Sequence, residues 1–351
     1  MFGPEPLFPR LSLEAAIRDL GARTARARAN AVRALPDALA TDLDPRDDTA
    51  DSHPITATQL QAHPRYTAAI EGLRALATDE DGFVRGLSLI GRGRLGDTSL
   101  LHAYREGALA PSEREPARQW IRESAMLGLG ELAKFTPPPP DLEHDEVLRC
   151  IIEGLEDPAP EVRFQAVAVL ADAAPSTVPN LLPSRLHEED EPEVRAQLYE
   201  VFLDRGDSPG AVVDAALQTV DVRDDATSLS DPGTDRESLA AARLLASLRR
   251  PEAAPRLLEA MHNPDDRDDA IEAMAVLAAE DIPEGAADLA RRLTRRWLVP
   301  PVTRVRAAYL LARVSPADGE ALLERMARSP RASVRDAVKD ARAALATLAQ
   351  R

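Results

Sequence analysis

Residues 155–170 read LEDPAPEVRFQAVAVL and contain the pattern that decides the fold. A turn rich in Pro and Asp leads to Val162 and Arg163, and small or apolar residues follow four and seven places after Val162, at Ala166 and Val169. Offsets of 0, 4 and 7 residues share one face of an α-helix. The stretch therefore predicts a turn that opens an amphipathic helix.

The same pattern recurs along the chain, with an apolar residue and Arg at its start. Six copies begin at Val84, Ile121, Val162, Val194, Val305 and Val334, and two degenerate copies begin at Asp235 and Asp266. Another amphipathic segment precedes each turn, so each unit is predicted to be a helix pair of about 30–40 residues. The expected pairs span 64–94, 96–134, 141–174, 176–206, 208–249, 251–280, 282–314 and 316–350.

These units resemble HEAT repeats, most closely the short HEAT-like repeats of the phycobilisome lyase type. The resemblance implies an all-α fold, an α-solenoid (superhelix) of about eight to nine HEAT-like helix pairs, with a concave surface formed by the second helices. It also implies a structural ladder in which turn acids pair with the arginines of the pattern, Asp157 with Arg163 and Asp190 with Arg195. The ladder positions are Arg85, Arg122, Asp157, Arg163, Asp190 and Arg195.

Three regions follow from this pattern. Residues 64–350 are predicted to form the HEAT-like array. Residues 1–35 are expected to be an N-terminal helical cap or a degenerate repeat, whose register is obscured because Arg26, Arg28 and Arg33 interrupt any apolar face. Residues 36–63 carry six acids and one Arg and are expected to be an acidic loop or a disordered insertion.

Composition favours helices and excludes several classes of protein. The 351 residues include 62 Ala and only 12 aromatic residues, and Ala is the best helix former. One cysteine excludes a disulfide framework and a Cys-based zinc site. No apolar run is long enough to span a bilayer, and the N-terminus lacks the features of a signal peptide, so we expect a cytoplasmic protein.

The charges are unequal in number and in type. There are 59 acids and 43 bases, 41 of them Arg, for a net charge of −16. Genome composition and salt adaptation both fit this balance. Proteins bind nucleic acids largely by neutralising phosphates with Lys and Arg. A chain this acidic is therefore not expected to bind nucleic acid as its main partner.

No motif in the sequence predicts catalysis or a cofactor. Residues 91–96 match G-x-G-x-x-G but follow a predicted helix, whereas the dinucleotide fingerprint follows a strand. The six histidines have no metal-binding spacing, and residues 79–82 are better explained as a helix-capping turn than as a calcium loop. Cys150 occupies an apolar position and is expected to be a buried thiol. We therefore expect no catalytic, cofactor or metal site and no enzyme activity.

The charge distribution suggests a binding surface instead. Residues 64–290 carry −23, whereas residues 291–351 carry +9. The candidate partner-binding residues are Arg291, Arg292, Arg295, Arg296, Trp297, Arg306 and Arg335. Arg306 and Arg335 are included because the turns before them contain no Asp, which leaves them without a ladder partner. The alternative is a solvated face whose charges meet acids of a neighbouring repeat.

A second group of arginines lies earlier in the chain. Arg114, Arg118 and Arg122 are spaced four residues apart around Trp120. Because Arg122 is a ladder position, we interpret this group as mainly structural.

The functional hypothesis is a non-enzymatic scaffold or adaptor for protein–protein interaction. It would use the concave surface and the basic C-terminal region, the latter to hold an acidic segment of another protein. An alternative implied by the resemblance is a chromophore (bilin) lyase-like or other accessory enzyme. A minor alternative is a DNA-binding protein resembling those of alkylation repair, and weak head-to-tail self-association is a further expectation.

Overall fold

In a computed structural model of the chain, residues 11–43, 55–105, 117–224 and 232–349 are described, and they form nineteen α-helices and four short 3₁₀ segments. The chain divides into two compact units, which we call the N-terminal unit (1–178) and the C-terminal unit (179–351). The sequence pattern places the array at 64–350 and does not reveal this division.

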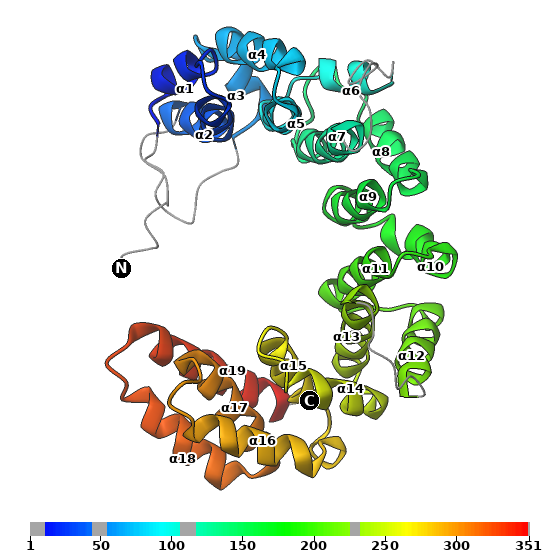
Figure 1. The fold of residues 1–351 in the computed structure, drawn as a ribbon, viewed down its shortest axis with the longest axis vertical. Helices are drawn as coiled ribbons and strands as arrows, with labels where there is room; N and C mark the ends of the chain where they lie inside the picture. The colour runs from blue at the N-terminus through cyan, green and yellow to red at the C-terminus, as the bar shows by residue number, and fades with distance from the viewer. Residues whose placement is uncertain (1–10, 44–54, 106–116, 225–231, 350–351) are drawn as a thin grey trace. The chain divides into compact units, whose positions relative to one another are not determined.

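The N-terminal unit contains four helix pairs and one short extra helix (Figure 1). The pairs are α1 (Leu13–Asp19) with α2 (Ala25–Leu43), α4 (Tyr66–Ala75) with α5 (Gly82–Arg94), α6 (Ser99–Arg105) with α7 (Ala117–Ala133), and α8 (His144–Glu153) with α9 (Pro160–Ala173). The extra helix is α3 (Ala57–Gln61), which the Thr56 capping box begins. The predicted pairs at 64–94, 96–134 and 141–174 are therefore confirmed.

The C-terminal unit continues the same alternation. Its helices are α10 (Val178–Glu188, which starts at the unit boundary) and α11 (Pro192–Arg205), α12 (Gly210–Asp224) and α13 (Pro232–Ser247), α14 (Ala254–Ala260) and α15 (Arg267–Met274), α16 (Glu284–Arg295) and α17 (Pro301–Val314), and α18 (Pro316–Ala327) and α19 (Ala332–Ala349). The remaining five predicted helical pairs coincide with these helices.

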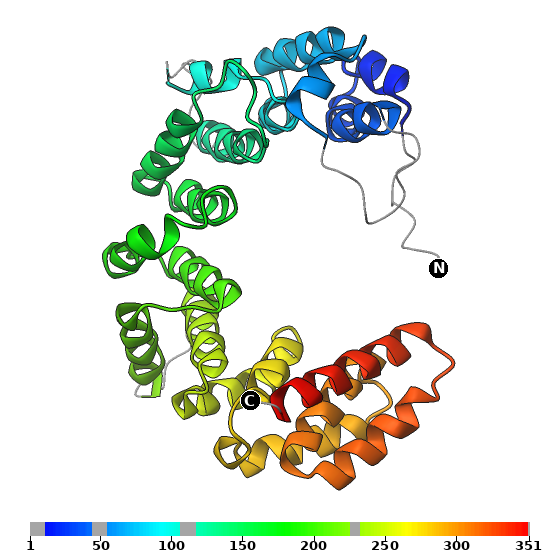
Figure 2. The same ribbon diagram turned by 180° about the vertical axis from the view of Figure 1, so that it is seen from behind.

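The second helices of successive pairs pack against one another within each unit. In the N-terminal unit α2, α5, α7 and α9 form this layer, and in the C-terminal unit it consists of α11, α13, α15, α17 and α19 (Figures 1 and 2). Each pair buries its apolar face only because a neighbouring pair covers it. The fold is thus an all-α solenoid of HEAT-like helix pairs.

Glycine allows the closest approach between two of these helices. A Cβ added to Gly93 in α5 would lie 2.0 Å from the carbonyl oxygen of Gly128 in α7, and one added to Gly128 would lie 2.6 Å from the carbonyl oxygen of Leu89. Only glycine, whose side chain is a single hydrogen atom, fits at these two positions. The absence of a side chain at Gly93 and Gly128 therefore lets α5 and α7 approach closely.

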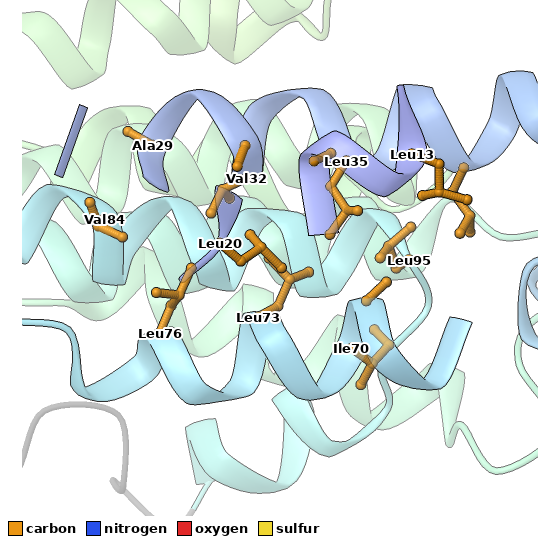
Figure 3. Close-up of a cluster of buried hydrophobic side chains, with 14 of the residues drawn as sticks. Leu13, Leu20, Ala29, Val32, Leu35, Ile70, Leu73, Leu76, Val84 and Leu95 are labelled. Carbon is orange, nitrogen blue, oxygen red and sulfur yellow. The ribbon is translucent and has the colours of Figure 1, made fainter. Parts of the chain in front are cut away.

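The N-terminal pair belongs to the array, and its core shows why. Leu20, Val32, Leu73 and Val84 come from the end of α1 and from α2, α4 and α5, and they share one apolar cluster (Figure 3). The repeat register of this pair is hard to read from the sequence because Arg28 lies on the buried side of α2. There an ion pair with Asp79 at 2.6 Å compensates the charge of Arg28.

The expected loop over 36–63 is partly wrong. Helix α2 runs to Leu43 with Pro36 inside it. Leu35 and Leu39 are fully buried on the same face of this helix. The free energy gained by burying them outweighs the loss of the one backbone hydrogen bond that Pro36 cannot donate. Residues 55–63 contain α3. Residues 44–54 lie outside the described part of the chain.

Candidate docking surface

The arginine of the repeat pattern folds back across its own turn. Five arginines donate to the backbone carbonyl six residues earlier: Arg85 to Asp79 (2.5 Å), Arg163 to Asp157 (2.9 Å), Arg195 to Glu189 (3.4 Å), Arg267 to Met261 (2.9 Å) and Arg335 to Ser329 (2.9 Å). Arg28 makes the same contact with Ala22 at 3.0 Å, which identifies it as the N-terminal copy of the pattern. These bonds satisfy carbonyls at the end of the first helix and its turn.

The residue that accepts this bond is itself an acid in three turns. The carboxylates of Asp79, Asp157 and Glu189 each accept the backbone N–H two residues later, at 2.9, 2.8 and 3.0 Å. The predicted ladder acid Asp190 is therefore wrong by one residue. Glu189 is buried and takes this position, whereas Asp190 is exposed.

Ion pairs then join successive helix pairs. The Asp157 carboxylate accepts two bonds from Arg122 of α7, and the Arg195 guanidinium donates to Glu237 of α13 at 2.6 Å. The Asp157 carboxylate thus pairs with Arg122 of the preceding helix pair, whereas Arg163, its predicted partner, donates to the Asp157 backbone carbonyl.

Two of the candidate binding residues belong to this structural system. Arg306 in α17 pairs with Asp268 at 2.5 Å and with Glu272, both in α15. The predicted absence of a ladder partner for Arg306 is wrong, because its partners lie on the preceding second helix and not in the turn. Arg335 donates to the carbonyls of Ser329 and Pro330, at 2.9 and 3.0 Å, and so caps its own turn.

The other candidates lie together at the end of α16 and in the turn after it. Arg291 bonds Asp288 at 2.7 Å in the same helix. Arg292, Arg295 and Arg296 are exposed and form no ion pair with any described residue. Beside them Trp297 is 82% and Leu298 76% exposed. We call Arg292, Arg295, Arg296, Trp297 and Leu298 the C-terminal docking surface.

The conformation of this surface follows from its buried neighbours. Leu293 and Val299 are buried on either side of the turn and anchor it to the core. Pro301 then begins α17, where its missing N–H costs nothing. The residues between the anchors are consequently turned outward. Sequence reasoning found Trp297 but missed Leu298, although two large apolar residues in a charged turn are a visible signal.

Cys150 and the motifs within 79–96 lie among the described residues. No group of three metal-binding side chains occurs among them, and none of their helices is long and apolar enough to cross a membrane. Cys150 is buried, and burial raises the pKa of its thiol to about 11. The glycines of 91–93 lie inside α5, and Gly96 turns the chain after it with φ of 72°. Asp81 caps α5 by accepting from the Phe83 and Val84 amides, as expected of a capping turn.

Comparisons with known proteins address the helix arrangement alone. No family model matches the chain, and no curated protein matches it. A solved structure described as showing that Kap95p binding induces the switch loops of RanGDP to adopt the GTP-bound conformation is similar over 93% of this chain, with 13% identity and a TM-score of 0.47. The match covers 52% of that chain, so this protein spans about half its length. A likeness at this level carries no argument about function.

Proposed function

We propose that this chain is a non-enzymatic, cytoplasmic protein-binding scaffold whose C-terminal docking surface holds an acidic segment of a partner protein. The observation that carries the proposal is the exposure of Trp297 and Leu298 beside three arginines without ion-pair partners among the described residues. In a chain with 59 acids, arginines left without carboxylates are available to carboxylates from outside.

The residue types suit a protein partner. Trp and Arg are the residues that most often dominate the free energy of protein–protein binding. An arginine guanidinium donates two parallel hydrogen bonds to a carboxylate, whereas Trp297 and Leu298 offer apolar area that a wholly charged ligand would leave uncovered. We therefore expect the partner segment to contain acids and at least one large apolar side chain.

The test uses Trp297 fluorescence in a Trp120→Phe chain, where Trp297 is the single tryptophan. The probe is a twelve-residue peptide of Glu and Asp with one central Leu. We expect saturable binding that weakens with salt, and a rise in Kd of about tenfold or more when Arg292, Arg295 and Arg296 are all changed to Glu.

The matched control changes the same charge elsewhere, in Arg18→Glu, Arg236→Glu and Arg250→Glu combined. These arginines lie on the surface and pair with Asp19, Glu193 and Glu252. An equal loss of affinity in the control would show that only net charge matters. Absence of binding to the unaltered chain would remove the proposal.

The lyase-like alternative makes a different prediction. Chain purified after co-expression with a bilin source would carry bound colour. The docking proposal expects a colourless protein under the same conditions.

A further inference from the structure

The N-terminal unit carries its own exposed aromatic residue in a group of three side chains from three helix pairs. The Phe83 ring in α5 stacks on Trp120 in α7, with 5.6 Å between centroids and 18° between planes. The Arg33 guanidinium in α2 lies over the same ring, 5.1 Å from its centroid. Among the described residues of this unit, Phe83 is the one exposed large apolar side chain, at 44%.

Gly86 explains how Trp120 reaches Phe83. A Cβ at Gly86 would lie 2.2 Å from the indole Nε1 of Trp120 and 2.5 Å from the Ser124 hydroxyl oxygen. Since Gly86 has no side chain, the indole lies directly on the backbone of α5. The position of the stack is therefore fixed by packing.

The helices that contribute Arg33 and Trp120 carry further arginines. Arg26 and Arg33 are seven residues apart on α2, so they share one face of it, and Arg118 lies in the first turn of α7. All three are exposed and form no ion pair with any described residue.

The nearby acids are already engaged. Glu80 pairs with Arg28 at 3.3 Å, and Asp81 caps α5. Asp37 pairs with Arg94 at 2.5 Å. Glu123 accepts a hydrogen bond from Gln119 at 3.0 Å.

We infer that the Arg33–Phe83–Trp120 group is a second docking surface, which binds a carboxylate-bearing peptide segment independently of the C-terminal docking surface. Arg33 and Trp120 reach the ring from α2 and α7, the helices that pack against α5, and Phe83 remains 44% exposed beside them. The edge of an aromatic ring carries partial positive charge, so it attracts carboxylates as the surrounding arginines do.

The same geometry disfavours a nucleic-acid ligand. Binding of single strands relies on bases that stack on open aromatic faces, and the Phe83 faces are engaged by Arg33 and Trp120. A net charge of −16 also repels a polyphosphate chain.

The experiment uses a Trp297→Phe chain, in which Trp120 is the single tryptophan and reports on this surface alone. Titration with the acidic peptide should change Trp120 fluorescence saturably, and Arg26→Glu with Arg33→Glu should raise the Kd at least fivefold. Arg18→Glu with Arg250→Glu is the control with an equal charge change, and it should leave the Kd within twofold. Circular dichroism verifies that each variant keeps its helices.

The two docking proposals can be disproved independently of each other. Loss of the Trp297 response with an intact Trp120 response removes only the C-terminal docking surface. Three results would each overturn the inference. The first is no change in Trp120 fluorescence on titration with the acidic peptide, and the second is an equal change with a peptide whose acids are replaced by Gln and Asn. The third is tighter binding of a single-stranded oligonucleotide.

Discussion

Arg122 and Asp157 are joined by two hydrogen bonds, Nε to Oδ2 at 3.0 Å and Nη2 to Oδ1 at 3.2 Å. Arg122 lies in α7, whereas Asp157 lies in the turn before α9, so the pair ties one helix pair to the next. The Asp157 carboxylate also accepts the Ala159 N–H at 2.8 Å. One side chain therefore shapes its own turn and fixes the stacking of its neighbour.

We predict that Asp157→Ala lowers the free energy of unfolding of the N-terminal unit by about 2 kcal/mol, because it leaves a half-buried guanidinium without this carboxylate. Asp157→Asn should cost less, since an amide oxygen can still accept from Ala159. Urea unfolding followed by Trp120 fluorescence in a Trp297→Phe chain measures this unit. Asp190→Asn is the control and should leave the midpoint unchanged; equal midpoints for all variants would contradict the structural role of Asp157.

A second prediction concerns the contact of α5 with α7. Gly93→Ala places a methyl group 2.0 Å from the Gly128 carbonyl oxygen, so the helices must separate, and we expect a loss of about 3 kcal/mol. Gly210→Ala is the matched control, since nothing lies within 4 Å of its added Cβ. That control should be neutral or stabilise by about 0.5 kcal/mol. A Gly93→Ala chain as stable as wild type in urea would refute the close packing.

Asp97 gives a prediction for pH. Burial raises its pKa, but hydrogen bonds from Arg74 and Ser99 and the nearby charge and hydrogen bond of Arg92 outweigh this and hold the pKa at about 2. The unfolded value is about 4, so the ionised form stabilises the fold above pH 4, and this stabilisation is lost as pH falls from about 4 to about 2. Asp97→Asn should therefore cost about 2 kcal/mol at pH 7 and progressively less towards pH 2.

The measurement for Asp97 is the free energy of unfolding of wild type and variant from pH 2 to pH 7. Asp207→Asn serves as a control because Asp207 is exposed. A difference between wild type and Asp97→Asn that stays constant over this range would show that the Asp97 carboxylate is not the titrating group.

The pattern around Arg163 was sufficient to predict the fold. Turn residues, the arginine and the apolar offsets are all local in sequence, so eight helix pairs could be placed from them. Residue 28 shows the limit of this reasoning. An arginine on a buried face looks like an interruption until its partner is known, and Asp79 is separated from it by 51 residues.

The binding surface was predictable only in part for the same reason. Trp297 and its arginines are adjacent in sequence, so the sequence alone predicts one cluster. The prediction for Arg306 is wrong because its acidic partners lie on α15, 34 and 38 residues earlier. The Phe83–Trp120 stack joins two helices of different repeats, and neither local spacing nor composition indicates such a contact.

Variants of Arg306 and Arg295 distinguish a structural role in the arginine ladder from a binding role in the C-terminal docking surface. Arg306 is bonded to two acids of the preceding pair, so Arg306→Ala should lower stability by about 1 kcal/mol and leave peptide affinity at the C-terminal docking surface unchanged. Arg295 is exposed and lacks an ion pair within the described residues, so Arg295→Ala should change stability by less than about 0.5 kcal/mol and weaken peptide binding. Urea unfolding and peptide titration of both variants in the Trp120→Phe chain give the four values required. The reverse assignment, with affinity lost in Arg306→Ala and stability lost in Arg295→Ala, would place the acidic segment on the second-helix layer instead of the α16 turn.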